Sequence, residues 1–284
     1  MLCPYGVKTR MESTFIILIF KKEDATMKSA ILVSVCLMLI GGLIGMAQST
    51  QMNLAGAWAF DDGAGKVAKD AVAGNNGELK GSLKWSAQGK YGGAIEFPGK
   101  GDSYVNIPYK KYMDSDAYTF TAWTKLNEAS YQYVAWMDGP TFPDDKNKRH
   151  LDIWIDQGDF VVFMWQTEAG AQGRLDGKTI IADGTWHHIA KWYDGKNVRM
   201  YIDGKSDGEI ATAKIITNGE DSLWIGARPG DVSATGIIDE VGLFTKALSE
   251  DELRSVMKQS LTILASVDSA NKLSTTWGEL KTKS

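Results

Sequence analysis

The feature that most constrains this chain is a two-residue alternation of apolar and polar side chains, which recurs in short segments separated by turns. In residues 197–203, Val198, Met200 and Ile202 fall on one face, and the intervening side chains are polar or aromatic. This period matches the pleat of a β-strand with one buried face. An Asp-Gly dipeptide, typical of tight hairpin turns, lies close to each end of the segment. The segment is therefore predicted to be a strand between two turns.

The same pattern extends over most of the chain. Further strands are predicted at residues 55–60, 94–97, 104–107, 118–126, 131–137, 150–156, 160–166, 187–193, 222–225 and 238–244. More than ten short strands without helices between them indicate a sandwich or a barrel of packed sheets. The sequence contains no internal repeat, and no proline- or serine-rich linker divides it into two domains.

One short helix is predicted after these strands. Ser249 is a good N-cap, and Glu252 three residues later completes a capping box. Leu253, Val256 and Met257 then form an apolar stripe at helical spacing. Residues 261–284 are predicted to be a tail without recognisable chemistry.

The N-terminal region predicts the compartment. Lys28 precedes an uncharged, mostly apolar run over residues 30–47, which ends in Gly45-Met46-Ala47. A basic start, an apolar centre and small residues at the end describe a secretory signal peptide, here residues 27–47 with cleavage after Ala47. An uncleaved membrane anchor is the alternative. Residues 1–26 are interpreted as an over-long N-terminal extension, and the mature protein is expected to be secreted or at the cell surface, with no membrane span.

Cysteine content and charge exclude several classes of function. Cys3 and Cys36 both precede the expected cleavage point, so the mature chain has no disulfide, no thiolate nucleophile and no cysteine-ligated metal. The formal net charge of the whole chain is −4, which provides no electrostatic reason to bind nucleic acid.

Several motifs, in a fixed order, resemble the laminin-G-like jelly roll, the concanavalin A-like lectin architecture in its bacterial secreted form. The stretches that carry the resemblance are residues 58–63, 70–79, 91–97, 118–123, 183–190, 198–204 and 236–249. The resemblance implies an all-β, two-sheet antiparallel jelly-roll sandwich with one short C-terminal helix, in a domain over residues 48–260. This scaffold serves lectins, adhesion modules, protein-binding domains and some enzymes, so it leaves the function open.

The sequence does not predict catalysis. Asp152 and Asp156 share a strand face but would lie roughly 13 Å apart at about 3.3 Å per residue, whereas paired glycosidase carboxylates lie about 5 to 10 Å apart. His187 and His188 belong to a motif of the resembled family, which implies a structural role. The alternative is an acid–base set around His150 and Asp152.

The resemblance also makes one structural calcium ion a candidate cofactor. It implies that Asp62, Asp70 and Asp239 meet near an edge of the sandwich, where a hard cation could bind their oxygens. A second group of candidate oxygens lies in the loop 138–148 and at Asp231. The alternative is that these aspartates form turns or are solvated charges.

A sugar-binding groove is predicted on one sheet face. In the strand 150–156 the apolar side chains point into the sandwich, and His150, Asp152 and Trp154 point the other way. Sugars stack on aromatic rings and bond to polar side chains beside them. The predicted ligand-binding residues are Trp136, Asp138, His150, Asp152, Trp154, Arg199 and Arg228. The alternative is that the tryptophans pack beneath loops.

These features together predict a secreted, non-catalytic binding module. Its expected partner is a glycan, a glycoprotein or another cell-surface component. The alternatives are a protein-binding structural adhesion domain and, less in keeping with the residues, a polysaccharide-active enzyme. A different measurement identifies each function: glycan binding for the binding module, protein binding for the adhesion domain, and turnover of a polysaccharide for the enzyme.

Overall fold

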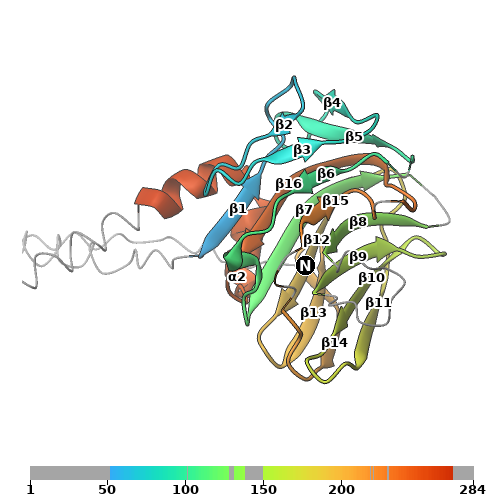
Figure 1. Cartoon of the computed structure of the whole chain (residues 1–284), viewed down its shortest axis with the longest axis vertical. Helices are drawn as coiled ribbons and strands as arrows, with labels where there is room; N and C mark the ends of the chain where they lie inside the picture. The colour runs from blue at the N-terminus through green and yellow to red at the C-terminus, as the bar shows by residue number, and fades with distance from the viewer. Residues whose placement is uncertain are drawn as a thin grey trace, which may run out of the picture. The chain divides into compact units, whose positions relative to one another are not determined.

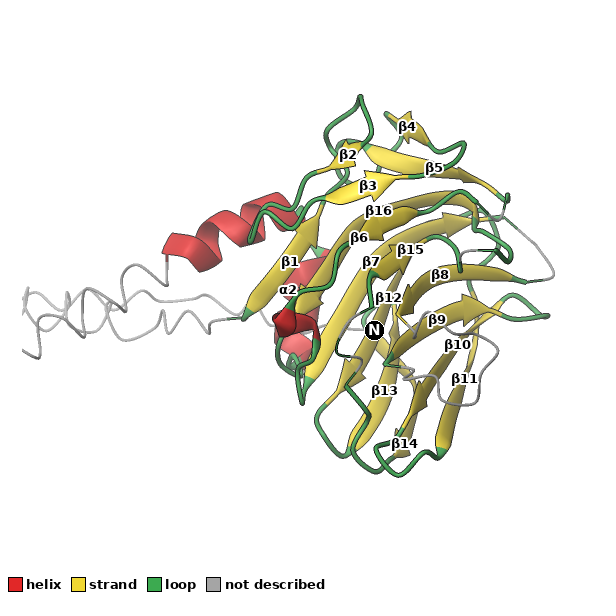
Figure 2. Ribbon diagram, in the orientation of Figure 1, coloured by secondary structure: helices red, strands yellow, loops and turns green. Residues whose placement is uncertain are grey.

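The computed structural model describes residues 52–100, 102–127, 131–137, 150–217, 219, 221–228 and 230–270. Figure 1 and Figure 2 show these residues as antiparallel sheets with short helices beside β1 (Leu54–Trp58). The predicted extension 1–26 and signal peptide 27–47, with its cleavage after Ala47, lie outside the described residues. None of the described helices combines the length and the apolar character needed to cross a membrane.

One eight-stranded sheet, here called sheet A, contains β16 (Thr235–Phe244), the longest of the described strands. Its strands are β1, β4 (Lys84–Ser86), β5 (Ala94–Pro98), β7 (Tyr118–Leu126), β12 (His187–Tyr193), β13 (Asn197–Ile202), β14 (Lys205–Ala211) and β16 (Thr235–Phe244). They lie in the order β14-β13-β12-β7-β16-β5-β4, with β1 also paired to β16. Non-consecutive neighbours such as β7 and β16 make long connections necessary, as in a jelly roll.

The second sheet, here called sheet B, also has eight strands. They are β2 (Val67–Ala68), β3 (Gly77–Leu79), β6 (Val105–Ile107), β8 (Gln132–Met137), β9 (Leu151–Ile155), β10 (Phe160–Gln166), β11 (Gln172–Ile180) and β15 (Leu223–Ile225). Their order is β11-β10-β9-β8-β15-β6-β3-β2. The predicted two-sheet antiparallel sandwich is confirmed.

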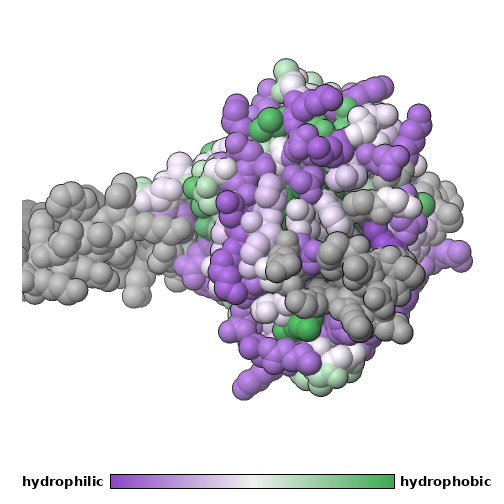
Figure 3. All heavy atoms as spheres, viewed as in Figure 1, coloured by the Kyte–Doolittle hydropathy of each residue, from purple (hydrophilic) through white to green (hydrophobic). Residues whose placement is uncertain are grey.

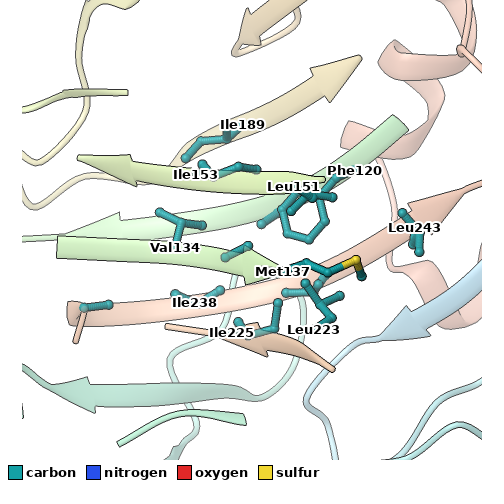
Figure 4. Packing of buried hydrophobic residues seen from close by; sticks show 14 of the residues in the cluster. Phe120, Val134, Met137, Leu151, Ile153, Ile189, Leu223, Ile225, Ile238 and Leu243 are labelled. Carbon is teal, nitrogen blue, oxygen red and sulfur yellow. The ribbon is translucent and has the colours of Figure 1, made fainter. Parts of the chain in front are cut away.

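The main hydrophobic core lies between the inner faces of the two sheets. Figure 4 shows Ile189 of sheet A beside Ile153 of sheet B, and Ile238 of sheet A beside Ile225 of sheet B, and all four side chains are fully buried. Alternation therefore works as the sequence predicts, because every second residue of these strands enters one shared core. Burial of this apolar surface is the main source of stability in a sandwich without disulfides.

The sequence predicts the central strands well and misses five others, β2, β3, β4, β11 and β14. The first three have only two or three residues each, which is too short for a period to show. β7, β10 and β12 begin and end at the predicted residues. β11 and β14 were missed because they lie at the sheet edges, where most side chains are exposed and an alternating apolar signal is weak. Asp207 of β14 joins these edges, since its Oδ2 accepts the backbone N–H groups of Lys178 at 2.7 Å and Thr179 at 3.2 Å.

The predicted helix is confirmed as α2 (Glu250–Met257), and both hydrogen bonds of its capping box are present at Ser249 and Glu252. A single 3-10 turn, η1 (Lys111–Met113), precedes β7. Residues 261–270 form another helical segment within what was predicted to be a featureless tail. Its Leu261 and Leu264 are buried with Trp192 in a second apolar cluster on the outer face of sheet A.

Glu240 connects this 261–270 helix to sheet A. It lies at a bulge of β16 with a positive φ of 51°, and its Oε2 accepts the backbone N–H of Leu261 at 2.6 Å. Burial raises the pKa of Glu240 to about 7. Burial and the neighbouring Glu240 raise the pKa of Asp239 to about 8. Two adjacent acidic groups therefore hold protons in the folded protein that an unfolded chain would release.

We expect Glu240→Gln to flatten the pH dependence of stability. A carboxyl group with a raised folded-state pKa stabilises the fold fully below its unfolded pKa, and that contribution is lost as pH rises towards the folded pKa. In the wild-type protein this group should lower the free energy of unfolding by about 2 kcal/mol between about pH 5 and about pH 7.5. Urea unfolding at both pH values measures the difference. Glu96→Gln, an exposed change on the same sheet, is the control; an unchanged slope in Glu240→Gln would contradict the assignment.

A second buried ionisable group, Lys191 of β12, lies inside the sandwich. Its neighbours Ile189 and Tyr193 on the same face belong to the main core, and Lys191 itself is 0% exposed. Its Nζ donates to the backbone carbonyl of Met164 in sheet B at 2.8 Å. Burial lowers the pKa of Lys191 to about 7. The ammonium group is thus held in the core by this hydrogen bond across the sheets and by the electrostatic attraction of Asp152.

We expect stability to rise with pH through this group and Lys191→Met to remove that rise. A lowered lysine pKa means that the unfolded chain binds the proton more tightly, so protonation opposes folding below the unfolded value of 10.5. The free energy of unfolding should increase by about 3 kcal/mol between about pH 7 and about pH 9.5 in the wild type. Denaturant titrations of wild type, Lys191→Met and the exposed control Lys66→Met test this; a rise that persists in Lys191→Met would contradict it.

Candidate functional site

A cluster of aromatic residues lies on the outer face of sheet B, away from the main core. We call it the aromatic face. Its buried members are Tyr133, Trp136, Trp154 and Val162, and its partly buried members are Tyr131, Phe160, Met164, Trp224 and Val232. Strand alternation places it there, because Ile153 and Ile155 on either side of Trp154 belong to the core. The predicted placement of Trp136 and Trp154 on one face is therefore confirmed.

The rings of the aromatic face contact one another mainly edge to face. The centroids of Tyr133 and Trp136 are 5.1 Å apart, and those of Tyr131 and Tyr133 are 5.3 Å apart. Tyr131 also lies 6.1 Å from Trp154. The hydroxyls of Tyr131 and Tyr133 are 3.1 Å apart, and burial raises the pKa of both tyrosines. The result is a packed aromatic cluster in which the hydroxyls of Tyr131 and Tyr133 stay protonated near neutral pH.

Two arginines lie against the tryptophans of this face, and both have acidic partners: Arg228 has Asp231, and Arg174 has Asp156 and, through its Nε at 2.6 Å, also Asp176. Arg174 has its guanidinium carbon 5.7 Å from the Trp154 ring, and its Nη2 lies 2.7 Å from Asp156 Oδ2. Arg228 lies 5.0 Å from the Trp136 ring, and its Nη1 lies 3.1 Å from an Asp231 oxygen. Each guanidinium group is therefore held in place by an aromatic ring and by acidic neighbours.

The two predicted tryptophans are themselves packed rather than open. Trp136 and Trp154 are each only 4% exposed, so the packing alternative describes them better than a bare stacking platform does. Among the described residues, none accepts a hydrogen bond from the indole N–H of Trp154. Tyr131, Trp224 and Arg174 retain accessible surface at the edge of the cluster. The view in Figure 3 is largely hydrophilic, with hydrophobic atoms in small separated areas.

Among the residues that sequence reasoning missed are Tyr131, Tyr133 and Trp224 of this face and the neighbouring Arg174, and the causes differ. Tyr133 and Trp136 are three positions apart, so strict alternation assigns them to opposite faces. A bulge between Tyr133 and Ala135 shifts the register and brings both onto the same face. Tyr131 precedes that bulge and contacts the same rings. Arg174 belongs to β11, the edge strand that alternation does not reveal.

The prediction that His150 points outward with Trp154 is wrong. His150 precedes the first residue of β9, so the alternation of that strand does not govern its side chain. It is 2% exposed, its ring lies 4.9 Å from that of Tyr118, and its Nδ1 is 3.0 Å from the carbonyl oxygen of Ile216. Burial lowers the pKa of His150 to about 4, which keeps the imidazole neutral.

Asp152 lies beside Trp136 in the strand register but is fully buried. Asp156 follows the end of β9 and is paired with Arg174. The two carboxylates therefore have different surroundings, one enclosed and one at the rim. Asp138, with the loop 138–148, lies outside the described residues.

Arg199 does not share the aromatic face, contrary to prediction. It lies on β13 of sheet A, with its guanidinium carbon 4.6 Å from the Trp192 ring and its Nη2 3.0 Å from Glu209. Trp192 belongs to the apolar cluster on the outer face of sheet A. Strand alternation gives the facing direction of a side chain but not the sheet to which its strand belongs, which explains the error.

The three predicted calcium ligands are engaged separately. Asp70 accepts four backbone N–H groups and so closes its own loop. Asp62 pairs with Lys69 at 2.9 Å, and Asp239 accepts the backbone N–H of Lys90 at 2.7 Å. Within the described residues, no three His, Cys, Asp or Glu side chains are grouped as a metal site. These three aspartates do not fit a shared ion, and a structural calcium ion elsewhere stays a prediction that a melting scan with and without calcium would test.

His187 takes part in a chain of polar groups that resembles a catalytic arrangement in distance alone. Its Nδ1 lies 2.8 Å from Asp203 Oδ2, and its Nε2 lies 3.0 Å from the Thr185 hydroxyl. That hydroxyl, however, donates to Asp183 Oδ1 at 2.8 Å, so its proton is directed away from the imidazole. A nucleophile–base pair needs the opposite direction. The arrangement instead fixes the start of β12, as the sequence motif implied.

Comparison with known proteins identifies the family that shares this architecture. The profile of the concanavalin A-like lectin/glucanases superfamily matches residues 99–254, more than half of the chain. A search of the curated proteins finds no relative of the sequence.

Solved structures share the fold at low sequence identity. The binding domain of Paraclostridial Mosquitocidal Protein 1 superposes with a TM-score of 0.57 at 14% identity, over 72% of this chain and 52% of that one. Domain 4 of AbnA, an extracellular arabinanase from Geobacillus stearothermophilus, was solved in complex with arabinotriose. It superposes with a TM-score of 0.57 at 20% identity, over 72% of this chain and 98% of that one. A Trypanosoma rangeli sialidase in complex with sialic acid superposes with a TM-score of 0.53 at 12% identity, over 81% of this chain and 38% of that one.

These neighbours include both binding domains and an enzyme, and the chain spans about half the length of the toxin binding domain. At such identities they establish a common fold and no more. The matched profile and the two-sheet jelly roll agree, and the chain belongs to the concanavalin A-like lectin/glucanase superfamily.

Proposed function

We propose that this protein is a non-catalytic glycan-binding module whose ligand lies against the aromatic face of sheet B. The observation that supports this most directly is the pair of arginines at the rim. Arg174 and Arg228 are each placed over a tryptophan and each held by an aspartate. Sugars combine C–H faces, which pack on aromatic rings, with hydroxyls that bond to fixed donors and acceptors.

The accessible groups define where a saccharide would make contact. Tyr131 and Trp224 supply partly exposed aromatic surface. Arg174 and Asp156 supply a donor and an acceptor whose side chains are 44% and 24% exposed. Because these polar groups are already oriented by their ion pairs, little side-chain entropy is lost when a ligand binds.

The neighbouring structures are compatible with this proposal. One carries arabinotriose and another carries sialic acid, and the mosquitocidal protein's matched part is named a binding domain. None of this identifies a sugar for the present chain. Secretion, with cleavage after Ala47, is part of the proposal and depends on the leader sequence alone.

We expect Arg174→Ala and Tyr131→Ala each to weaken glycan binding by about tenfold, the loss of one charge-assisted bond or one aromatic contact. Binding is first located on an array of neutral glycans that includes arabino-oligosaccharides, and is then measured by calorimetry. The matched control is Arg199→Ala. It removes the same kind of Arg–Trp contact and acid pair, but from sheet A, and it should leave the affinity unchanged.

Three results would contradict the proposal. Equal loss in Arg199→Ala would show that the effect is not specific to the aromatic face. A silent array for a protein that melts cooperatively would favour a protein-binding adhesion domain instead. Release of new reducing ends from a bound polysaccharide, abolished by Asp152→Asn, would show that the module is catalytic.

A further inference from the structure

A pocket lies on the outer face of sheet A, where the C-terminal end of α2 approaches the strands. Its volume is about 550 Å³, within the range of small-molecule sites. Its floor is Trp123 of β7, and its walls come from the turn between β13 and β14 and from α2. The side chains that matter here are Lys90, Lys205, Met257 and Lys258.

At and beneath the floor of this pocket, two buried polar atoms have no hydrogen-bond partner among the residues that the structure describes. One is the indole N–H of Trp123, a side chain that is 6% exposed. His188 packs against it with ring centroids 5.2 Å apart, and its buried Nδ1 also lacks a partner. The Lys90 ammonium lies 3.9 Å from the Trp123 ring centroid. The indole N–H of Trp123 is thus a donor available to an acceptor group, and the Lys90 ammonium lies on the face of the same ring.

The uncompensated charge around the pocket is positive. Within the described part of the chain, Lys90, Lys205 and Lys258 have no ion-pair partner. The nearby carboxylate of Asp203 is already occupied, since it accepts from His187 and from a backbone N–H. Arg254 is neutralised by Glu250 and Asp251 and is not counted.

The pocket walls are fixed to one another. Tyr91 donates its hydroxyl to the carbonyl oxygen of Met257 at 2.6 Å, which joins the segment before β5 to the last turn of α2. This bond also occupies one of the free carbonyl groups at the helix C-terminus, which would otherwise repel an anion. Gly204 closes the opposite wall, where any side chain would meet Met257.

We propose that this pocket is a second ligand site, which binds an oxyanion carried on a sugar-sized ring. The carboxylate or sulfate group accepts from the lysine ammonium groups, and the ring lies over the apolar surface of Met257, beside the Lys90 ammonium that covers Trp123. Lysine suits such a group because it presents several mobile donors to a point charge. The site does not depend on the aromatic face, since the two lie on the outer faces of different sheets.

The test compares three sugars that differ only at carbon 6: galacturonate, galactose 6-sulfate and galactose. Binding is measured by calorimetry and by the shift of the Trp123 indole N–H resonance, assigned with Trp123→Phe. We expect the full chain to bind at least one acidic sugar at least tenfold more tightly than galactose. The variant Lys205→Ala/Lys258→Ala should weaken that binding at least tenfold. Whichever acidic sugar binds identifies the oxyanion as a carboxylate or a sulfate ester.

The matched control is Lys66→Ala/Lys196→Ala, which removes the same charge from exposed positions outside the pocket. Equal loss in this control would overturn the proposal, because the effect would then come from net charge. If Arg174→Ala weakened binding of the acidic sugar and Lys205→Ala/Lys258→Ala did not, the proposal would also be overturned. The acidic sugar would then be assigned to the aromatic face. Equal affinity for galactose, or no binding of either acidic sugar, would overturn it as well. The aromatic-face proposal is tested by a separate measurement, the effect of Arg174→Ala on the binding of neutral glycans.

Discussion

The structure depends on the burial of one face of each sheet against the other. Because the described domain contains no disulfide, the apolar inner faces must supply nearly all of the stabilisation. This requirement explains the strict alternation in the central strands, such as β9, where Ile153 and Ile155 point inward. It also explains why a charge inside the core is tolerated only with a partner, as for Lys191 and the carbonyl of Met164.

With the inner faces occupied, the two outer faces are free to differ. On sheet A, α2 and the 261–270 helix cover part of the face with a second apolar cluster, and Glu240 fixes the second of these helices to β16. On sheet B, the outer face carries aromatic rings edged by arginine–aspartate pairs. Both proposed sites therefore lie where strand alternation directs side chains away from the core and no helix completely covers them.

The two proposed sites differ in chemistry because their strands supply different side chains. The aromatic face offers rings and paired charges, which suit a neutral saccharide. The sheet A pocket offers one tryptophan floor and three lysines without acid partners in the described chain, which suits an anion. A single ligand type would not satisfy both, so the module can be examined for two independent binding events.

The sequence by itself determined the sandwich, the bounds of strands such as β7 and the cap of α2, because these depend on local period and local hydrogen bonds. It also placed Trp136 and Trp154 on one face. Tertiary structure decided the rest. The bulge that adds Tyr133, the edge strand that supplies Arg174 and the sheet to which Arg199 belongs all depend on strand pairing. Pairing joins residues that are distant in sequence, and a two-residue period carries no information about which strands become neighbours.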